Sequence, residues 1–162
     1  MQHSSRRKKI VILGGGCGGI VAATHLGRKH GADHDVILID RRPDHIFMPA
    51  FLFIMIGERR PHDISRSLKH LEKRNVKVIQ SEILGIDPSR QEVSLQQGKM
   101  NYDYLIVSLG LKTRPDLVPG SAESSQHPWE MDSAVRLRES LESFQGGRVV
   151  VGVPLVPLRC PP

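Results

Sequence analysis

Residues Lys9 to Asp40 read KIVILGGGCGGIVAATHLGRKHGADHDVILID, and their pattern indicates the fold class. A short apolar run at Ile10–Leu13 leads directly into six residues, GGGCGG, at positions 14–19. Small residues follow, and a second apolar run at Val36–Ile39 ends on the acid Asp40. Short apolar runs bounded by turn residues are typical of buried strands. We therefore predict a strand, a glycine turn, a helix and a second strand.

The spacing of these glycines and of the acid predicts a dinucleotide site. Gly14 would allow a tight turn, Gly16 a close approach of the backbone to a pyrophosphate, and Gly19 close packing of the helix on the sheet. The phosphates would bind the free N–H groups at the helix N-terminus, where the dipole favours anions. Asp40 follows Gly19 by 21 residues, about the spacing of a carboxylate that binds ribose hydroxyls. The alternative, a glycine-rich turn in another doubly wound protein, would leave Asp40 without a task.

Length and composition describe an ordinary globular chain. Its 162 residues suffice for one domain with a proper core, and 39% hydrophobic with 25% charged residues exclude disorder except at the ends. The net charge is +6, and we interpret the one dense basic cluster, residues 6–9, as a solvated tail. An aromatic content of 4% disfavours nucleic-acid binding, whereas attraction to an anionic membrane surface stays open.

Targeting and metal signals are weak. The apolar run after residue 9 is too short for a secretory signal, and Ile46–Ile56 contains a proline and is too short to span a bilayer, which takes about 20 residues. Cys17 and Cys160 match neither a disulfide framework nor a metal pattern, and the eight histidines show no metal-ligand spacing. We expect synthesis in the cytoplasm and no metal site.

The middle of the chain predicts further α/β elements. Residues 50–57 are apolar at nearly every position, so we expect burial on more than one side. Residues 63–73 have helical spacing, and residues 76–79 predict a short strand. An antiparallel hairpin laid on the main sheet is expected at 81–97. Residues 101–107 form the strongest strand pattern after the opening pair.

The last third changes character. Proline and glycine make residues 111–129 a loop and the best position for a domain boundary. A helix is expected at 132–144, stopped by two glycines, and a strand of the buried type at 148–153. A helix followed by one strand is the opening of a second α/β unit, and the sequence ends at Pro162 without the remainder.

Three features together resemble a known group of flavoproteins. They are the glycine loop ending at Asp40, the strand end YDYLIVSLG at 102–110, and VVVGVP at 149–154 running into Arg159-Cys160-Pro161-Pro162. The combination resembles the two-dinucleotide-domain proteins of the pyridine-nucleotide disulfide reductase superfamily. Within it, the Cys-Pro-Pro ending and the segment His45-x-Phe47-x-Pro49 are similar to sulfide:quinone oxidoreductases and flavocytochrome c sulfide dehydrogenases. The resemblance covers the chain from Lys9 onward.

The resemblance implies an α/β fold with a Rossmann-like FAD-binding domain, in which a parallel sheet with helices carries a β-hairpin. We expect a basic tail at 1–8, this domain at 9–120, and a linker with the truncated start of a second dinucleotide-binding-like domain at 121–162. The backbone near Ile83 would lie at the adenine, and Pro49 would approach the flavin end. The residues expected to bind FAD are Gly14, Gly16, Cys17, Gly18, Gly19, Asp40, Arg41, Pro49, Ile83, Leu109 and Gly110.

The resemblance also implies oxidation of sulfide, with electrons passing through the flavin to a quinone. Cys160 matches a redox-active cysteine whose thiolate is the nucleophile, while the flavin carries the electrons; without that match, Cys160 is an ordinary loop cysteine. Family members continue with a second redox cysteine and a region that associates peripherally with the membrane. We therefore expect an N-terminal portion that is incomplete for catalysis, and an uncovered strand edge would favour association of copies.

Alternatives remain open from the sequence. A type II NADH:quinone oxidoreductase or another pyridine-nucleotide flavoprotein would need a second glycine fingerprint, which Gly152-Val153-Pro154 does not begin. A truncated nucleotide-binding fragment without catalysis is the alternative from another class. Cys17 could be a reactive thiol at a helix N-terminus, although packing as a small residue is preferred. His45 could be a functional residue or a turn histidine, and Asp103 is interpreted as structural.

Overall fold

The structure is a computed structural model that describes residues 6–153. The chain divides into two compact units. The first, here called the sheet unit, runs to Ile46 and resumes from Ser65 to Gly110. The second, here called the helical unit, takes Phe47–Ile64 and continues from Leu111. The domain boundary expected after residue 120 stays a prediction.

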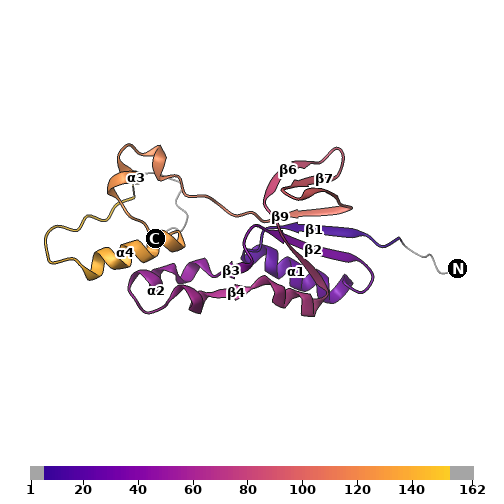
Figure 1. Cartoon of the computed structure of the whole chain (residues 1–162), viewed down its shortest axis with the longest axis horizontal. Helices are drawn as coiled ribbons and strands as arrows, with labels where there is room; N and C mark the ends of the chain where they lie inside the picture. Colours follow the sequence, from indigo (N-terminus) through magenta and orange to yellow (C-terminus); the bar gives the residue numbers. More distant parts are fainter. Residues whose placement is uncertain (1–5, 154–162) are drawn as a thin grey trace. The chain divides into compact units, whose positions relative to one another are not determined.

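The sheet unit is built on a parallel sheet of strands in the order β5-β2-β1-β9. Figure 1 shows α1 (Cys17–His30) on one face of this sheet, between β1 and β2 in sequence. The four strands are β1 (Lys9–Leu13), β2 (Asp35–Asp40), β5 (Val76–Gln80) and β9 (Tyr104–Val107). The predicted strand, glycine turn, helix and strand are confirmed, and so is the Rossmann-like α/β fold.

Both faces of this sheet are covered, which explains why its strands are apolar without alternation. Successive side chains of a strand point to opposite faces. Ile12 and Leu38 therefore pack in one cluster with Ala23 of α1, and all three are fully buried. Val11 and Ile39 pack in a second cluster with residues of the smaller sheet, and they too are fully buried.

The smaller sheet is antiparallel and consists of β6 (Ile83–Asp87), β7 (Glu92–Leu95) and β8 (Gly98–Asn101). It contributes Val93 and Leu95 to the second cluster, so the predicted hairpin on the main sheet is confirmed and gains a third strand. The strand predicted at 101–107 starts later, at Tyr104. The reason is that the chain changes sheets there: the Tyr102 N–H donates to Gln91, whereas the Asp103 N–H donates to Lys9 of β1.

The helix predicted at 63–73 is wrong in its middle. Ile64 ends a 3₁₀ turn (Pro61–Ile64), β4 (Ser65–Ser67) follows, and a second 3₁₀ segment runs from Leu68 to Arg74. Ser65–Ser67 is extended because it pairs antiparallel with β3 (Asp44–Ile46). The apolar residues of the pattern, Leu68 among them, are nevertheless buried as the spacing predicts.

In the helical unit, α2 (Phe51–Met55) packs against α4 (Met131–Glu142), as Figure 1 shows. The unit also contains the 3₁₀ turns Met48–Ala50 and Pro115–Leu117 and the short α3 (Ser121–Ser124). The predicted helix at 132–144 is confirmed. The expectation that 50–57 is buried on several sides is wrong, because α2 buries Phe51 and Ile54 only, and its other side exposes Leu52, Phe53 and Ile56.

Two further expectations from the sequence are corrected. Residues 148–153 form no strand, and Val151 is 93% exposed, because no strand in the described part of the chain pairs with this segment. The basic cluster is not wholly a solvated tail, since Arg7 donates to Asp35 at 2.6 Å and Lys8 pairs with Asp103 at 3.2 Å. Between residues 6 and 153, no helix is long and apolar enough to cross a membrane.

Candidate dinucleotide site

The glycine loop leaves β1 between the carboxyl ends of two neighbouring strands. Gly14 has φ +103°, a conformation that side chains disfavour. Its N–H donates to the Ile39 carbonyl of β2 at 2.8 Å, and a Cβ at Gly14 would lie 2.2 Å from the Ser108 carbonyl oxygen after β9. Position 14 therefore has to be glycine for steric reasons set by the protein itself.

The start of α1 is pressed onto this loop. A Cβ at Gly19 would lie 1.8 Å from the Gly14 carbonyl oxygen, and a Cβ at Gly18 would lie 2.7 Å from Ser108 Oγ. These contacts keep the first turn of the helix directly above the strand ends. Ser108 was missed as a residue of the loop, and the only signal for it was the small-residue corner Ser108-Leu109-Gly110.

Gly16 differs from its neighbours because the surrounding protein gives no steric reason for a glycine there. Its φ of −74° and ψ of −176° suit any residue, and among the described atoms none lies within 4 Å of a Cβ built at this position. The space beside Gly16 is therefore open to a ligand. No described side chain caps α1, and its first turn carries no acid, so its N-terminal dipole can bind an anion. Gly16 and Cys17, which is exposed, border this anion position.

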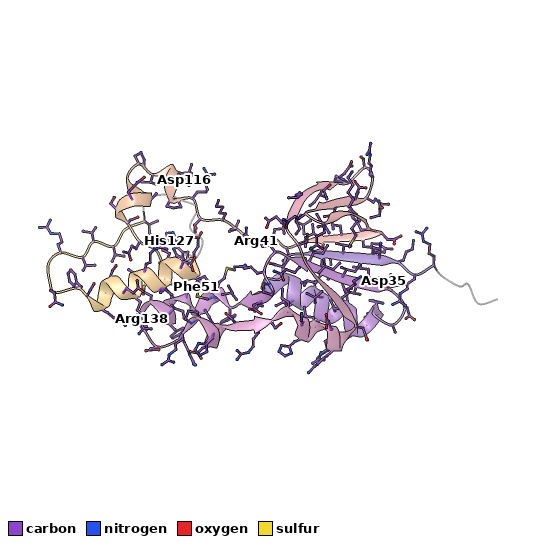
Figure 2. All side chains as sticks on the ribbon, viewed as in Figure 1. Asp35, Arg41, Phe51, Asp116, His127 and Arg138 are labelled. Atoms are coloured by element: carbon purple, nitrogen blue, oxygen red, sulfur yellow. The ribbon has the colours of Figure 1, made fainter. Side chains whose placement is uncertain are left out.

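Asp40 lies at the carboxyl end of β2 and faces the loop. Its Oδ2 accepts from the Gly15 N–H at 2.6 Å, and its Oδ1 accepts from the Arg42 N–H at 2.8 Å. A carboxylate has about four acceptor positions, so Asp40 can accept ribose hydroxyls in addition. Figure 2 shows Arg41 at this end of β2 and Asp35 at the other. Arg41 is exposed and lies 3.9 Å from Glu82.

The remaining sheet-unit residues flank the same edge. The Ser81 N–H donates to the Asp40 carbonyl oxygen at 3.0 Å. Because β6 begins two residues later, at Ile83, this hydrogen bond holds the start of β6 near the carboxyl end of β2. The Leu109 Cα lies 3.2 Å from the Cβ position of Gly14, and Gly110 turns the chain with φ +77°. The predicted FAD-binding residues of the sheet unit thus lie at the carboxyl ends of β1, β2 and β9, with Ile83 just after the carboxyl end of β5. This is the edge at which open α/β sheets bind ligands.

Two predicted site residues are not brought into this group. Pro49 belongs to the helical unit, and Cys160 lies outside the described residues. Their roles stay predictions. Within residues 6–153, no cluster of His, Cys, Asp or Glu could hold a metal ion.

Asp103 lies at the opposite end of the sheet from the loop. Its carboxylate accepts from the Lys9 N–H at 2.7 Å and from Lys8 Nζ at 3.2 Å. The backbone hydrogen bond from Lys9, followed by that from Lys8, lowers the pKa of Asp103 below its ordinary value. Asp103 connects the start of β9 to the start of β1, which is a structural task, as the sequence suggested.

The loop, the bare helix N-terminus and the acid after β2 together define a dinucleotide-binding domain of the Rossmann type. The family described as pyridine nucleotide-disulphide oxidoreductase matches residues 8–153, and the chain belongs to this family of oxidoreductases. Members of the family are FAD-binding flavoproteins, so the FAD prediction is confirmed at the level of the family.

Relatives narrow the position within the family. The sulfide-quinone reductase of Aquifex aeolicus is 36% identical over 152 residues, which cover 90% of this chain and 34% of the relative. The mitochondrial sulfide:quinone oxidoreductase of Mus musculus is 25% identical over 158 residues, covering 94% and 35%. The chain thus spans about a third of the length of these relatives, so the similarity alone does not assign their enzyme activity to it.

Solved structures support the same fold. The crystal structure of the Aquifex aeolicus sulfide:quinone oxidoreductase superposes with a TM-score of 0.72 at 34% identity, covering 83% of this chain and 32% of that one. The NDH2 of Plasmodium falciparum, solved in complex with NADH, superposes with a TM-score of 0.70 at 25% identity, covering 83% and 29%.

Proposed function

We propose that this chain is the FAD-binding part of an enzyme that oxidises sulfide and passes the electrons to a quinone. The observation that carries FAD binding is the open space at Gly16 beside the uncapped start of α1. The choice of sulfide and quinone is supported by the 36% identity to the Aquifex aeolicus sulfide-quinone reductase across 90% of this chain.

Each residue group of the sheet unit has a binding task in this proposal. The N–H groups of the first turn of α1 and of Gly16 bind the pyrophosphate. Leu109 and Gly110 close the other side of the phosphate position. Asp40 accepts the ribose hydroxyls, and Arg41 with the backbone at Ile83 borders the adenosine.

The chemistry divides between cofactor and protein. FAD, when bound, supplies the two-electron carrier, and the protein supplies position and exclusion of water. Pro49 approaches the flavin end of the cofactor. Cys160 provides a thiolate as the nucleophile toward sulfur, since the thiolate and not the thiol is reactive. Both roles are proposed from the resemblance of the chain to the family.

A second candidate is reduction of a quinone by a nicotinamide dinucleotide. It is favoured by the 25% identity to the Plasmodium falciparum NDH2 and by 26% identity to the alternative NAD(P)H-ubiquinone oxidoreductase C1 of Arabidopsis thaliana. A third is nucleotide binding by this chain without catalysis.

A spectroscopic experiment separates the three candidates. The purified chain is reconstituted with FAD, and its visible spectrum is followed anaerobically after addition of sulfide or, separately, NADH, and then a short-chain quinone. We expect bound-flavin absorbance in the wild type and equally in a Cys160→Ser variant. Bleaching by sulfide that quinone restores, in the wild type but not in Cys160→Ser, would show that this portion already carries out the sulfide step. Absence of bound flavin would defeat the whole proposal. Bleaching by NADH alone supports the second candidate, and bleaching by neither reductant supports the third.

A further inference from the structure

The peptide groups around Gly15 are held from two sides. The Asp40 carboxylate accepts the Gly15 N–H at 2.6 Å, and the Nδ1 atom of His45 lies 2.9 Å from the Gly15 carbonyl oxygen. His45 comes from β3 and is half-buried. Side chains from two different strands thus form hydrogen bonds with the N–H and the carbonyl of the same glycine in the loop.

The chemistry of the second contact is fixed by the acceptor. A carbonyl oxygen can only accept, so His45 Nδ1 must carry a proton, and the neutral ring is the Nδ1–H tautomer. The contact is therefore a hydrogen bond donated by His45 to the Gly15 carbonyl.

This hydrogen bond sets the direction of a neighbouring N–H group. The Gly15 carbonyl and the Gly16 N–H belong to the same planar trans peptide, and they point in opposite directions. Holding the carbonyl toward His45 therefore directs the Gly16 N–H away from it. The preceding peptide is fixed in turn because its N–H, on Gly15, is held by Asp40.

The loop needs such support because its own residues give it little. Glycine populates a wide range of backbone conformations, and ordering it costs more entropy than ordering other residues. Positions 14–16 are all glycine. The Gly15 side facing Leu68 is tightly packed, since a Cβ there would lie 2.6 Å from Leu68 Cδ1, whereas the Gly16 side is open. A loop fixed before the ligand arrives binds it with a smaller ordering cost.

We propose that His45 is a positioning residue for the pyrophosphate: its Nδ1–H holds the Gly15 carbonyl and thereby aims the Gly16 N–H at the phosphates. The inference rests on the proposed function, because it takes this loop to be the phosphate site. It gives His45 a task that differs from that of Asp40, which binds the ribose as well as the loop.

The test compares two substitutions of His45 in the whole chain. His45→Leu removes the donor, whereas the amide nitrogen in His45→Asn can occupy the position of Nδ1 and donate. Dissociation constants for FAD, ADP and adenosine are measured by titration, alongside thermal unfolding without ligand. We expect His45→Leu to weaken FAD and ADP about tenfold and adenosine little, and His45→Asn to restore binding to within about threefold. Asp40→Asn, the matched control, should weaken all three ligands.

Each outcome decides between the possibilities. Equal weakening by both His45 variants, or a loss of adenosine binding as large as that of ADP, overturns the inference in favour of general packing. Unchanged ADP binding in His45→Leu also overturns it. If the wild-type chain binds ADP but no FAD, the proposed function fails while the inference is still decided on ADP. Binding of neither ligand by the wild type overturns both. Nitrogen NMR of His45 should show the Nδ1–H tautomer, and the other tautomer would contradict the geometry.

Discussion

Two apolar segments of nearly the same composition have opposite surroundings. Ile10–Leu13 is at most 7% exposed, whereas the exposed fractions of the valines in residues 149–153 run from 60% at Val153 to 93% at Val151. The first segment has a parallel strand on each side and is covered on both faces. The second pairs with no strand of the described chain. An apolar pattern typical of buried strands therefore shows only that a segment needs partner strands to become buried. Whether those partner strands are present depends on other parts of the chain.

The largest effect should come from a substitution in the core around the covered segment, where Leu38 of β2 pairs with Ile12. Leu38 is fully buried between α1 and the strands, so Leu38→Ala should lower the free energy of unfolding by about 2–5 kcal/mol. The matched change in the exposed segment, Val151→Ala, should change it by less than about 0.5 kcal/mol. Chemical denaturation of both variants checks the difference. A loss in Val151→Ala comparable to that in Leu38→Ala would mean that the exposed segment is packed in solution.

The same contrast between filled and open space occurs within the glycine loop, at Gly19 and Gly16. A Cβ at Gly19 would overlap the Gly14 carbonyl oxygen, so Gly19→Ala should cost about 1–3 kcal/mol of folding stability. Gly16→Ala meets no described atom within 4 Å and requires no unusual backbone. It should lower stability by no more than about 1 kcal/mol, because Gly16 is the N-cap residue of α1, where alanine is less favourable than glycine. It should weaken FAD binding at least tenfold, since its methyl group would occupy the phosphate position.

These two substitutions are compared by denaturation and by flavin titration on the same preparations. The result that contradicts the site is a Gly16→Ala chain that binds FAD as tightly as the wild type. A Gly19→Ala chain of unchanged stability would contradict the packing of α1 on the loop.

The parts of the fold that were predicted correctly are those determined by local sequence. Gly14 and Gly19 belong to a pattern of fixed spacing in which Gly19 packs on the nearby Gly14 carbonyl, and Asp40 follows Gly19 by 21 residues. The extended segment Ser65–Ser67 could not be predicted, because its conformation depends on pairing with β3, some 20 residues earlier. Likewise, nothing in the pattern of residues 148–153 could reveal that no partner strand is present in the described part.

The site was predictable to the same extent. The glycines and Asp40 were found because their chemistry is tied to sequence spacing. The contact of Ser108 with Gly18 and the hydrogen bond from His45 to Gly15 could not be found, because each joins residues 30 or more positions apart. Such contacts produce no periodic pattern in the sequence. The residues around His45 would read the same whether or not its side chain formed a hydrogen bond with the glycine loop.

The smallest expected effect is a difference in stability between substitutions of two carboxylates, Asp103 in the sheet unit and Asp116 in the helical unit. Asp103 connects β9 to β1 across more than 90 residues of sequence, mainly through the Lys9 N–H, whereas Asp116 pairs with Arg114, two residues away. In both cases these contacts lower the pKa of the carboxyl group, through the Lys9 N–H at Asp103 and the Arg114 side chain at Asp116. A lowered pKa in the folded state contributes stability above the unfolded pKa of about 4, and this contribution is lost as the pH falls through the folded value.

We therefore expect Asp103→Asn to lower the unfolding midpoint at pH 7, and the gap to the wild type to close as the pH is lowered from about 4 toward 2. Asp116→Asn should have a smaller effect over the same range, because its partner is local and both side chains are more than half exposed. Thermal unfolding of the three chains at several pH values measures both gaps. A gap for Asp103→Asn that persists unchanged at pH 2 would show that its role lies in packing rather than in its charge, because only the ionised carboxylate is lost on acidification.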